Sequence, residues 1–189
     1  KSTLKISGAR FALVNPEIHV KGFVSYNVDA ESEELYQSQY AHLDPMHPSR
    51  FKDSDVTVIC SDTMMTEQEW RQSVFYLNYM APHHFDHDTD IFFRQNSEIV
   101  AVLSLLRNDK LGAFNEDELS MLRNMQPFME YALNSVYQPK RFSERELFSD
   151  KYCLTKRELD VLEFAMAGHN NKTIANELNL SLPTVRTHL

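Results

Sequence analysis

Three histidines and three aspartates lie within nine residues of the sequence, in the run PHHFDHDTD at 82–90. Imidazole and carboxylate groups are common protein ligands of zinc and other transition metals. The run falls where a predicted helix ends and a strand begins, and no second cluster of such ligands occurs elsewhere. We therefore interpret it as a solvated turn whose histidines favour the helix C-terminus, and we expect no metal and no cofactor.

A second set of residues suited to binding chemistry lies near the C-terminus. Thr155 and Glu158 have the spacing of a capping box and predict the start of a helix. A second helix begins near Asn171, and Ser181 caps a third helix. The apolar stripes predicted to bury the three helices are Leu159, Leu162, Ala165 and Met166, then Ile174, Ala175 and Leu178, then Leu182, Val185 and Leu189, with Gly168 ending the first helix. Two short helices joined by a tight turn form a helix-turn-helix.

The run LTKRELDVLEFAMAGHNNKTIANELNLSLPTVRTHL resembles the LuxR-type DNA-binding domain. This resemblance implies binding to double-stranded DNA, with the third helix in the major groove. Arg186 and Thr187 then project outward as base contacts, while Lys172 and Thr184 contact phosphate. His188 is interpreted as a packing or phosphate-side residue. The family domain continues past the last residue given, so the resemblance also implies that the DNA-binding domain is incomplete in this sequence.

The remainder of the chain predicts an antiparallel sheet flanked by helices. Strands are predicted within 8–30, at 56–62 and as a hairpin split by Asn96-Ser97, and helices at 31–43, from Thr66 to before Pro82 and from Asn115 to Tyr137. This order resembles the GAF/PAS-type sensor fold, and it implies an α+β domain followed by an all-α helix-turn-helix domain. We expect a sensory domain at 1–137, a polar linker at 138–152 and the DNA-binding domain at 153–189.

Four residues of the predicted sensory domain suit a small-molecule site. Tyr36 and Tyr40 lie four residues apart and Asp44-Pro45 follows, a pattern that resembles the autoinducer-binding domain of quorum-sensing LuxR proteins. An aspartate inside an aromatic wall orients a ligand by accepting its N–H. Trp70 would complete the wall, although Tyr36 stands where that family has tryptophan. An acyl-homoserine lactone, another small ligand and control by a partner protein with no ligand remain alternatives, and the tyrosines also fit plain core packing.

The helix predicted at 115–137 carries more apolar residues than one packing face needs. One stripe consists of Leu119, Leu122, Met125, Met129, Ala132 and Val136, and the residues off it are Met121, Phe128 and Tyr131. Exposed apolar area of this kind commonly marks an interface, and helix-turn-helix proteins usually read paired half-sites. We therefore expect a homodimer.

Charge and composition narrow the class of protein. The net charge is −8, but residues 140–189 carry eight Lys+Arg against seven Asp+Glu, leaving eleven against twenty in 1–139. Phosphate affinity depends on local basic groups, so the acidic total does not exclude DNA. The two distant cysteines suit a reducing cytoplasm. The sequence holds no apolar run long enough for a membrane helix and no GxSxG, P-loop or HExxH motif, so we expect a cytoplasmic protein that is neither a membrane protein nor an enzyme.

Overall fold

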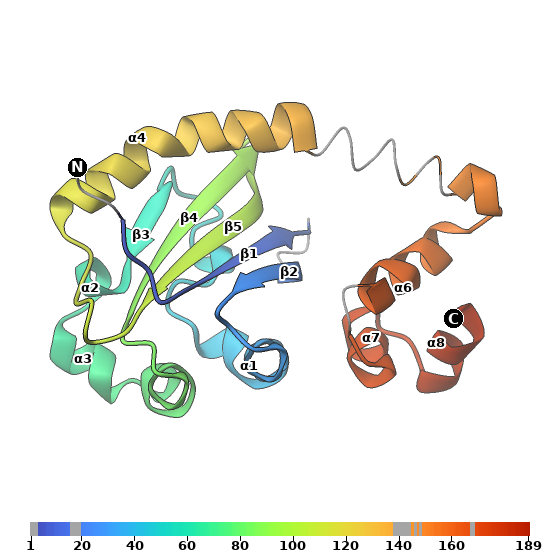
Figure 1. Ribbon diagram of the computed structural model, residues 1–189, viewed down its shortest axis with the longest axis horizontal. Coiled ribbons are helices and arrows are strands. Elements are labelled where there is room, and N and C mark those ends of the chain that lie inside the picture. Colours follow the sequence, from blue (N-terminus) through green and yellow to red (C-terminus); the bar gives the residue numbers. More distant parts are fainter. Residues whose placement is uncertain (1–3, 16–19, 138–144, 146, 148, 167–168) are drawn as a thin grey trace. The chain divides into compact units, whose positions relative to one another are not determined.

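Figure 1 shows a computed structural model of the chain, which describes residues 4–15, 20–137, 145, 147, 149–166 and 169–189. The chain divides into two compact units, at 1–130 and 131–189. Each unit has a hydrophobic core of its own. Most of the predicted linker lies outside the described residues, at 138–144, 146 and 148, and so does Gly168.

A five-stranded antiparallel sheet forms the centre of the N-terminal unit, with the strand order β2-β1-β5-β4-β3. Its strands are β1 (Gly8–Val14), β2 (Val20–Tyr26), β3 (Val58–Cys60), β4 (His87–Gln95) and β5 (Glu98–Arg107). The β4–β5 turn places Asn96 and Ser97 at φ values of 52° and 70°, the left-handed pair that a tight two-residue hairpin turn requires. The predicted antiparallel sheet is confirmed.

Helices lie on both faces of this sheet (Figure 1). The α-helices of the unit are α1 (Ala30–Leu35), α2 (Ser61–Met64), α3 (Glu67–Gln72) and α4 (Glu116–Ala132). Three π-helical segments follow three of them at Tyr36–Tyr40, Tyr76–Met80 and Leu133–Tyr137, and short 3-10 turns occupy Ala41–Leu43, Pro48–Arg50 and Ala81–His83. Within the described residues, no helix is both long enough and apolar enough to cross a membrane.

The predicted helix from Thr66 begins correctly but does not continue to Met80. Thr66 and Glu69 form the capping box, in which each side chain bonds the backbone N–H of the other residue. The helix stops at Ser73, whose backbone is extended, and the Ser73 hydroxyl then accepts a bond from the N–H of Tyr76 as a new helical segment starts. This break lets the two segments cover different parts of the sheet.

The buried stripe of α4 agrees with the predicted stripe only at its start, because Met129 and Ala132 are half-buried and Leu133 is buried. Leu119 and Leu122 are buried as expected, but Met125 is 47% exposed and Gln126 is buried in its place. The Nε2 atom of Gln126 donates to the carbonyl of Phe92 at 2.9 Å. Met125 was predicted to be buried because it is apolar. Gln126 is buried instead because the helix turns its side chain toward the sheet, where it bonds a strand carbonyl.

Among the described residues of the C-terminal unit, 145, 147 and 149–152 are helical, and three further helices follow them: α6 (Lys156–Met166), α7 (Asn171–Glu177) and α8 (Leu182–His188). The predicted Thr155–Glu158 capping box is present, and Ser181 caps α8 by accepting from the N–H of Thr184. The unit's buried core consists of Val161, Phe164, Ile174, Ala175, Leu178 and Val185. The predicted burial of Met166, Leu182 and Leu189 is wrong, because a short three-helix unit has room for only one central stripe on each helix.

Candidate functional site

A row of polar side chains crosses one face of the sheet in the N-terminal unit. Arg10 of β1 pairs with Ser104 of β5, which pairs with Asp90 of β4, so these three side chains project from the same face. Asp88 lies two residues before Asp90 on β4 and shares that face. All four residues are buried. The next row along this face is apolar and consists of Ala12, Val102 and Phe92.

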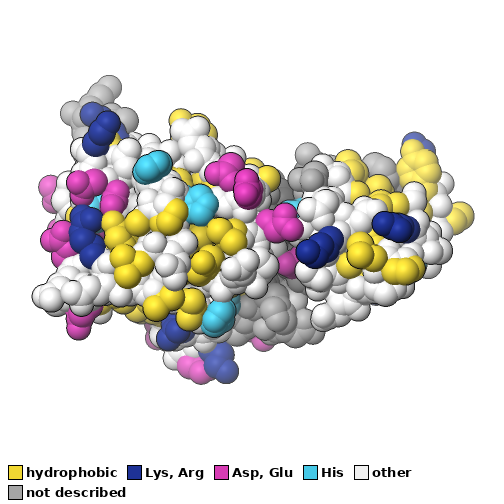
Figure 2. All heavy atoms as spheres, turned by 90° about the horizontal axis from the view of Figure 1, so that it is seen from below, with side chains coloured by type: hydrophobic (Ala, Val, Ile, Leu, Met, Phe, Trp, Pro, Cys, Tyr) yellow, Lys and Arg dark blue, Asp and Glu magenta, His cyan; other side chains and the backbone are white. Residues whose placement is uncertain are grey.

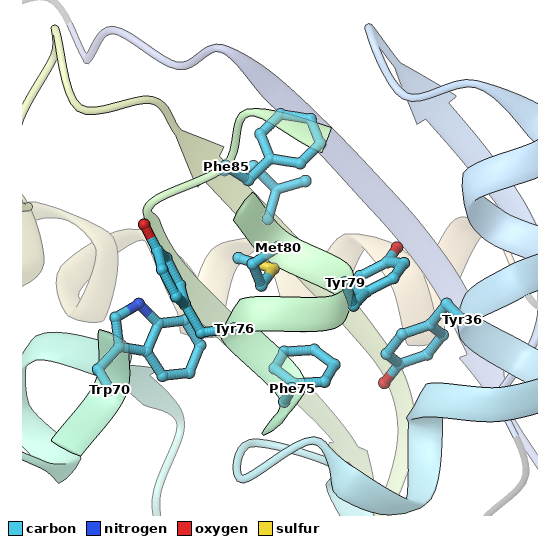
Figure 3. Packing of buried hydrophobic residues seen from close by; sticks show 8 residues of the cluster. Tyr36, Trp70, Phe75, Tyr76, Tyr79, Met80 and Phe85 are labelled. Atoms are coloured by element: carbon cyan, nitrogen blue, oxygen red, sulfur yellow. The ribbon is translucent and has the colours of Figure 1, made fainter. Parts of the chain in front are cut away.

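Aromatic side chains from the helical segments, which Figure 3 shows packed together, contact this polar row at Arg10. The guanidinium carbon of Arg10 lies 4.8 Å from the centroid of the Tyr36 ring and 5.8 Å from that of Tyr79. Arg10 Nη1 also donates to the Tyr79 hydroxyl at 2.8 Å. The rings of Tyr36 and Tyr79 have centroids 5.5 Å apart and lie side by side. Arg10 is therefore held by both a hydrogen bond and two aromatic faces, which strengthen each other away from water.

Asp44 joins the same cluster from the end of the helical segment that begins at Ala30. The Tyr36 hydroxyl donates to its Oδ2 at 2.7 Å, and the N–H of Met46 donates to its Oδ1 at 2.7 Å. The carboxyl is buried, and this burial raises its pKa, although the two hydrogen bonds and the charge of Arg10 oppose the rise. Asp44 thus fixes the orientation of the Tyr36 ring.

Several buried polar atoms of this cluster have no hydrogen-bond partner within the described part of the chain. They are Asp88 Oδ1, Asp90 Oδ1, Glu33 Oε1, Arg10 Nε and both amide atoms of Gln37. Burial raises the pKa of Asp88 to about 7 and that of Asp90 well above its ordinary value, and the charge of Asp88 raises the pKa of Asp90 further. A hydrogen bond with Ser104 partly opposes the rise in the pKa of Asp90, but a buried carboxyl oxygen without a partner is costly, so stability of the fold alone does not explain this cluster.

The structure brings three of the four predicted ligand residues together. Tyr36 and Asp44 are hydrogen bonded, and the Tyr40 ring lies 5.6 Å from that of Tyr79, which contacts Tyr36. Trp70 lies farther along the aromatic cluster, against Phe75 and Tyr76, and its Nε1 donates to the carbonyl of Asp86 at 2.8 Å. Figure 3 shows the indole beside Tyr76, separated from Tyr36 by Phe75.

The prediction that residues 82–90 form a solvated turn is wrong for their second half. His87, Asp88 and Asp90 belong to β4 and are buried, and His87 Nδ1 lies 3.0 Å from Asp62 Oδ1. These polar residues belong to the sheet because β4 pairs with β5 from His87 to Gln95. Within the described residues, no group of three His, Cys, Asp or Glu side chains is arranged to hold a metal ion.

Asp88, Asp90 and Arg10 were not among the predicted site residues. A period of two along β4 and β1 was the available signal, since it places Asp88 and Asp90 on one face and Arg10 among the buried positions of an alternating strand. Arg10 and Asp90 are aligned by the register between the strands. The sequence pattern does not predict this register.

The C-terminal unit arranges α7 and α8 as a helix-turn-helix. Asn170 caps α7 by accepting from the N–H groups of Lys172 and Thr173, and Asn179 adopts a left-handed φ of 51° in the turn before Ser181. Val185 is completely buried, so it fixes the rotation of α8 about its axis. The next residue along the helix, Arg186, is exposed.

The five predicted DNA-contacting residues lie on these two helices and differ in exposure. Arg186 and Thr187 were predicted to project outward, and both are exposed; the predicted phosphate contact Lys172 is exposed as well, whereas Thr184 and His188 are half-buried. The Thr184 hydroxyl lies 2.7 Å from the Ser181 hydroxyl, and the Thr187 hydroxyl donates to the carbonyl of Pro183 at 3.0 Å. Lys and Arg side chains are visible on the face of the C-terminal unit in Figure 2.

Comparison with known proteins identifies this unit. Residues 152–189 match the family described as bacterial regulatory proteins, luxR family. The chain carries a luxR-family DNA-binding domain. Over 186 residues it is also 28% identical to the monoamine regulon transcriptional regulator of Klebsiella aerogenes, covering 98% of this chain and 76% of that protein. The chain is thus a transcriptional regulator with a luxR-type helix-turn-helix.

Solved structures with the same fold cover the N-terminal unit as well. Escherichia coli SdiA superposes with a TM-score of 0.50 at 15% identity, over 97% of this chain and 74% of that one. A GAF domain/HD domain protein from Geobacter sulfurreducens superposes with a TM-score of 0.51 at 7% identity, over 70% of this chain and 82% of that one. These likenesses confirm the predicted α+β fold with a GAF-like N-terminal unit.

Proposed function

We propose that this regulator is a cytoplasmic homodimer that binds double-stranded DNA through α8 and senses a small molecule with its N-terminal unit. The observation that supports DNA reading best is the orientation of α8, in which Val185 is buried and the adjacent Arg186 is exposed. A guanidinium on the outer face of a recognition helix can form two hydrogen bonds with guanine O6 and N7.

The remaining residues of α7 and α8 divide into two roles in this proposal. Thr187 offers its methyl group to a thymine, since its hydroxyl hydrogen already bonds the carbonyl of Pro183. Lys172, Thr184 and His188 contact phosphate and position the helix without reading sequence. The position of Lys172 directly after the first residue of α7 supports this assignment, because a helix N-terminus favours a phosphate.

The dimer proposal rests on the outer side of α4. Phe128 is 73% exposed and Tyr131 is 68% exposed, and Met125 lies one turn from Phe128 on the same helix. Side chains of this size are rarely left in water by a monomer when they are grouped. A second copy of the chain is the partner that a helix-turn-helix regulator needs to read paired half-sites.

Sensing of a small molecule is supported by the buried polar cluster over the sheet. Tyr36, Tyr40 and Asp44 supply an aromatic wall and a carboxylate acceptor, as the sequence pattern predicts, while Trp70 belongs to the surrounding core. The name of the Klebsiella aerogenes relative, a monoamine regulon transcriptional regulator, further supports a regulatory role tied to a small metabolite. The enzyme alternative gains no support from a regulator family.

In vitro selection tests the DNA half of this proposal. The purified chain is incubated with a library of random DNA duplexes, and bound duplexes are amplified over several rounds. We expect one enriched motif for the unaltered chain and for Lys110→Ala, which removes an exposed charge from the N-terminal unit. Arg186→Ala should lose or relax the motif. A library that stays random with the unaltered chain would contradict the proposal.

Native mass spectrometry of the full chain, purified directly from cells, tests the other half. We expect the mass of a dimer, and a mass increment from a bound small molecule in part of the population. A monomer at micromolar concentration would contradict the homodimer. A dimer that shows no increment and no response to any metabolite extract would favour control by a partner protein.

A further inference from the structure

We propose that the N-terminal unit recognises the protonated amine of a small organic ligand, which it binds at the carboxyl groups of Asp88 and Asp90, next to Arg10 and the rings of Tyr36 and Tyr79. This inference rests on the proposed function, because it names the chemical class of the sensed molecule. It is carried by three observations: an excess of buried acidic groups, carboxyl oxygens with no hydrogen-bond partner among the described residues, and aromatic rings in the same cluster.

The first observation is the imbalance of charge. Four buried carboxyls interact with a single buried cation, Arg10, and they come from three different parts of the unit: Glu33 from α1, Asp44 from the end of the following segment, and Asp88 and Asp90 from β4. Buried charges in proteins are normally paired one to one. One guanidinium cannot neutralise four carboxylates, so the cluster is complete only when a further cation enters or when several of the acids stay protonated.

The second observation concerns hydrogen bonding. Asp88 is 1% exposed and Asp90 is 3% exposed, yet Oδ1 of each has no hydrogen-bond partner within the described residues. The two side chains project from the same face of β4 toward the helical layer. An ammonium group carries three N–H donors, so it can satisfy both free oxygens at once and still reach a third acceptor. A hydroxyl has one donor and leaves one of the two oxygens unpaired.

The third observation separates an organic cation from a metal ion. The guanidinium of Arg10 already lies over the rings of Tyr36 and Tyr79, and the Tyr40 ring lies 5.6 Å from that of Tyr79, so this part of the unit holds an organic cation against aromatic rings. Aromatic faces attract organic ammonium groups and also pack the carbon skeleton that carries the charge. A hard cation requires several converging oxygen ligands, and no described group of three acidic or histidine side chains has that arrangement.

Arg10 has a separate part in this arrangement. Its Nη1 is committed to Tyr79, whereas its Nε has no partner among the described residues. Its charge lowers the pKa of the four carboxyls against the effect of burial, and a ligand ammonium would favour their ionised forms in the same way. Because the ligand joins the sheet residues to the helical segment at Ala30–Leu43, binding ties two layers of the unit together and favours the ordered arrangement of both.

A matched ligand panel on the full chain tests the inference. The probes are 2-phenylethylamine, 2-phenylethanol and phenylacetate, which share a ring and a two-carbon arm but carry a cation, a neutral hydroxyl and an anion. Butylamine, butanol and butyrate repeat the comparison without the ring. Binding is followed by the emission of Trp70, the only tryptophan, and by the thermal unfolding midpoint at millimolar probe concentration.

We expect both amines to raise the midpoint, 2-phenylethylamine the more strongly, and the alcohols and carboxylates to leave it unchanged. Asp88→Asn and Asp90→Asn should weaken amine binding about tenfold or more, the loss typical of a buried charged hydrogen bond. Asp53→Asn, which neutralises an exposed aspartate, should bind as the unaltered chain does. Circular dichroism of each variant establishes that it is folded.

Several results would overturn the inference. One is equal binding of the alcohol and the amine, and another is undiminished amine binding by folded Asp88→Asn and Asp90→Asn. No response to either amine, or an equal response to calcium chloride alone, would do the same. In each of these cases, a dimer that carries a bound neutral metabolite, or that selects a DNA motif, would still support the proposed function. Only the inference that the sensed molecule is an amine would then be wrong.

Discussion

Replacing Asp88 with asparagine should remove much of the pH dependence of the stability of the N-terminal unit. The carboxyl of Asp88 is 1% exposed, and burial raises its pKa from 3.8 to about 7. Between these two pH values the folded state binds a proton that the unfolded state has released. The free energy of unfolding therefore falls as the pH rises from about 4 to about 7, and it stays at the lower value above that range.

The size of the effect follows from the difference between the folded and unfolded pKa of Asp88. A tenfold change in an acid's ionisation constant corresponds to about 1.4 kcal/mol, so a rise of about three in pKa corresponds to a total of about 4 kcal/mol. About 2 to 3 kcal/mol of this lies between pH 5 and pH 8, the interval in which a measurement is practical. Asparagine has nearly the same shape and no proton to lose. Burial also raises the pKa of Asp44 and Asp90, so the variant keeps a weaker dependence of the same sign.

Urea denaturation at pH 5 and pH 8 measures this difference. Trp70 is buried in the N-terminal unit and is the only tryptophan, so its emission reports the unfolding of that unit and not of the helix-turn-helix. The free energy of unfolding of the unaltered chain and of Asp53→Asn should fall from pH 5 to pH 8. The fall in Asp88→Asn should be smaller by about 2 kcal/mol. Equal pH dependence in Asp88→Asn and the unaltered chain would refute the reasoning, because it would show that Asp88 ionises freely when folded.

Three further predictions concern DNA contact, the core of the C-terminal unit and the dimer. Lys172→Ala should weaken binding to all duplexes alike and reduce the slope of log affinity against log salt concentration by about one, as expected for the loss of one phosphate contact; an unchanged slope would contradict that role. Val185→Ala should destabilise the C-terminal unit by about 2 kcal/mol, seen as an earlier loss of helical circular dichroism with the Trp70 transition unmoved; a shift of both transitions would contradict independent cores. Phe128→Asp should convert dimer to monomer in sedimentation velocity, whereas Val74→Asp, at another exposed apolar position, should not; a dimeric Phe128→Asp would place the interface elsewhere.

Local signals in the sequence predicted where several helices begin, although the end predicted for the helix from Thr66 was wrong. The Thr66–Glu69 and Thr155–Glu158 capping boxes and the Ser181 cap all occur as expected, because each depends on residues three apart in the chain. The helix-turn-helix was predictable for a similar reason, since a short unit is specified mostly by its own caps and turns. Burial was less predictable at the ends of the helices. Leu182, the first residue of α8, is 39% exposed in spite of its apolar side chain.

The candidate ligand site was only half predictable. The sequence pattern indicated that Tyr36 and Asp44, eight residues apart, belong to one site, but it did not predict the hydrogen bond that joins them. The opposite half of the site depends on strand register, which places Arg10 and Asp90 on either side of Ser104 although they lie far apart in the chain. The run at 82–90 was interpreted as a surface turn because its residues are polar, and polar residues are mostly exposed. Asp88 and Asp90 are nevertheless buried in the sheet.

The affinity of the chain for its selected DNA duplex, with and without Arg186, tests the central claim most directly. Fluorescence anisotropy at one salt concentration gives the dissociation constant for the selected duplex and for a scrambled duplex of the same composition. We predict that Arg186→Ala weakens binding to the selected duplex about 5- to 150-fold, the loss of about 1 to 3 kcal/mol typical of one bidentate base contact, and weakens binding to the scrambled duplex much less. An equal loss on both duplexes, or no loss on either, would contradict the assignment of α8 as the helix that reads DNA.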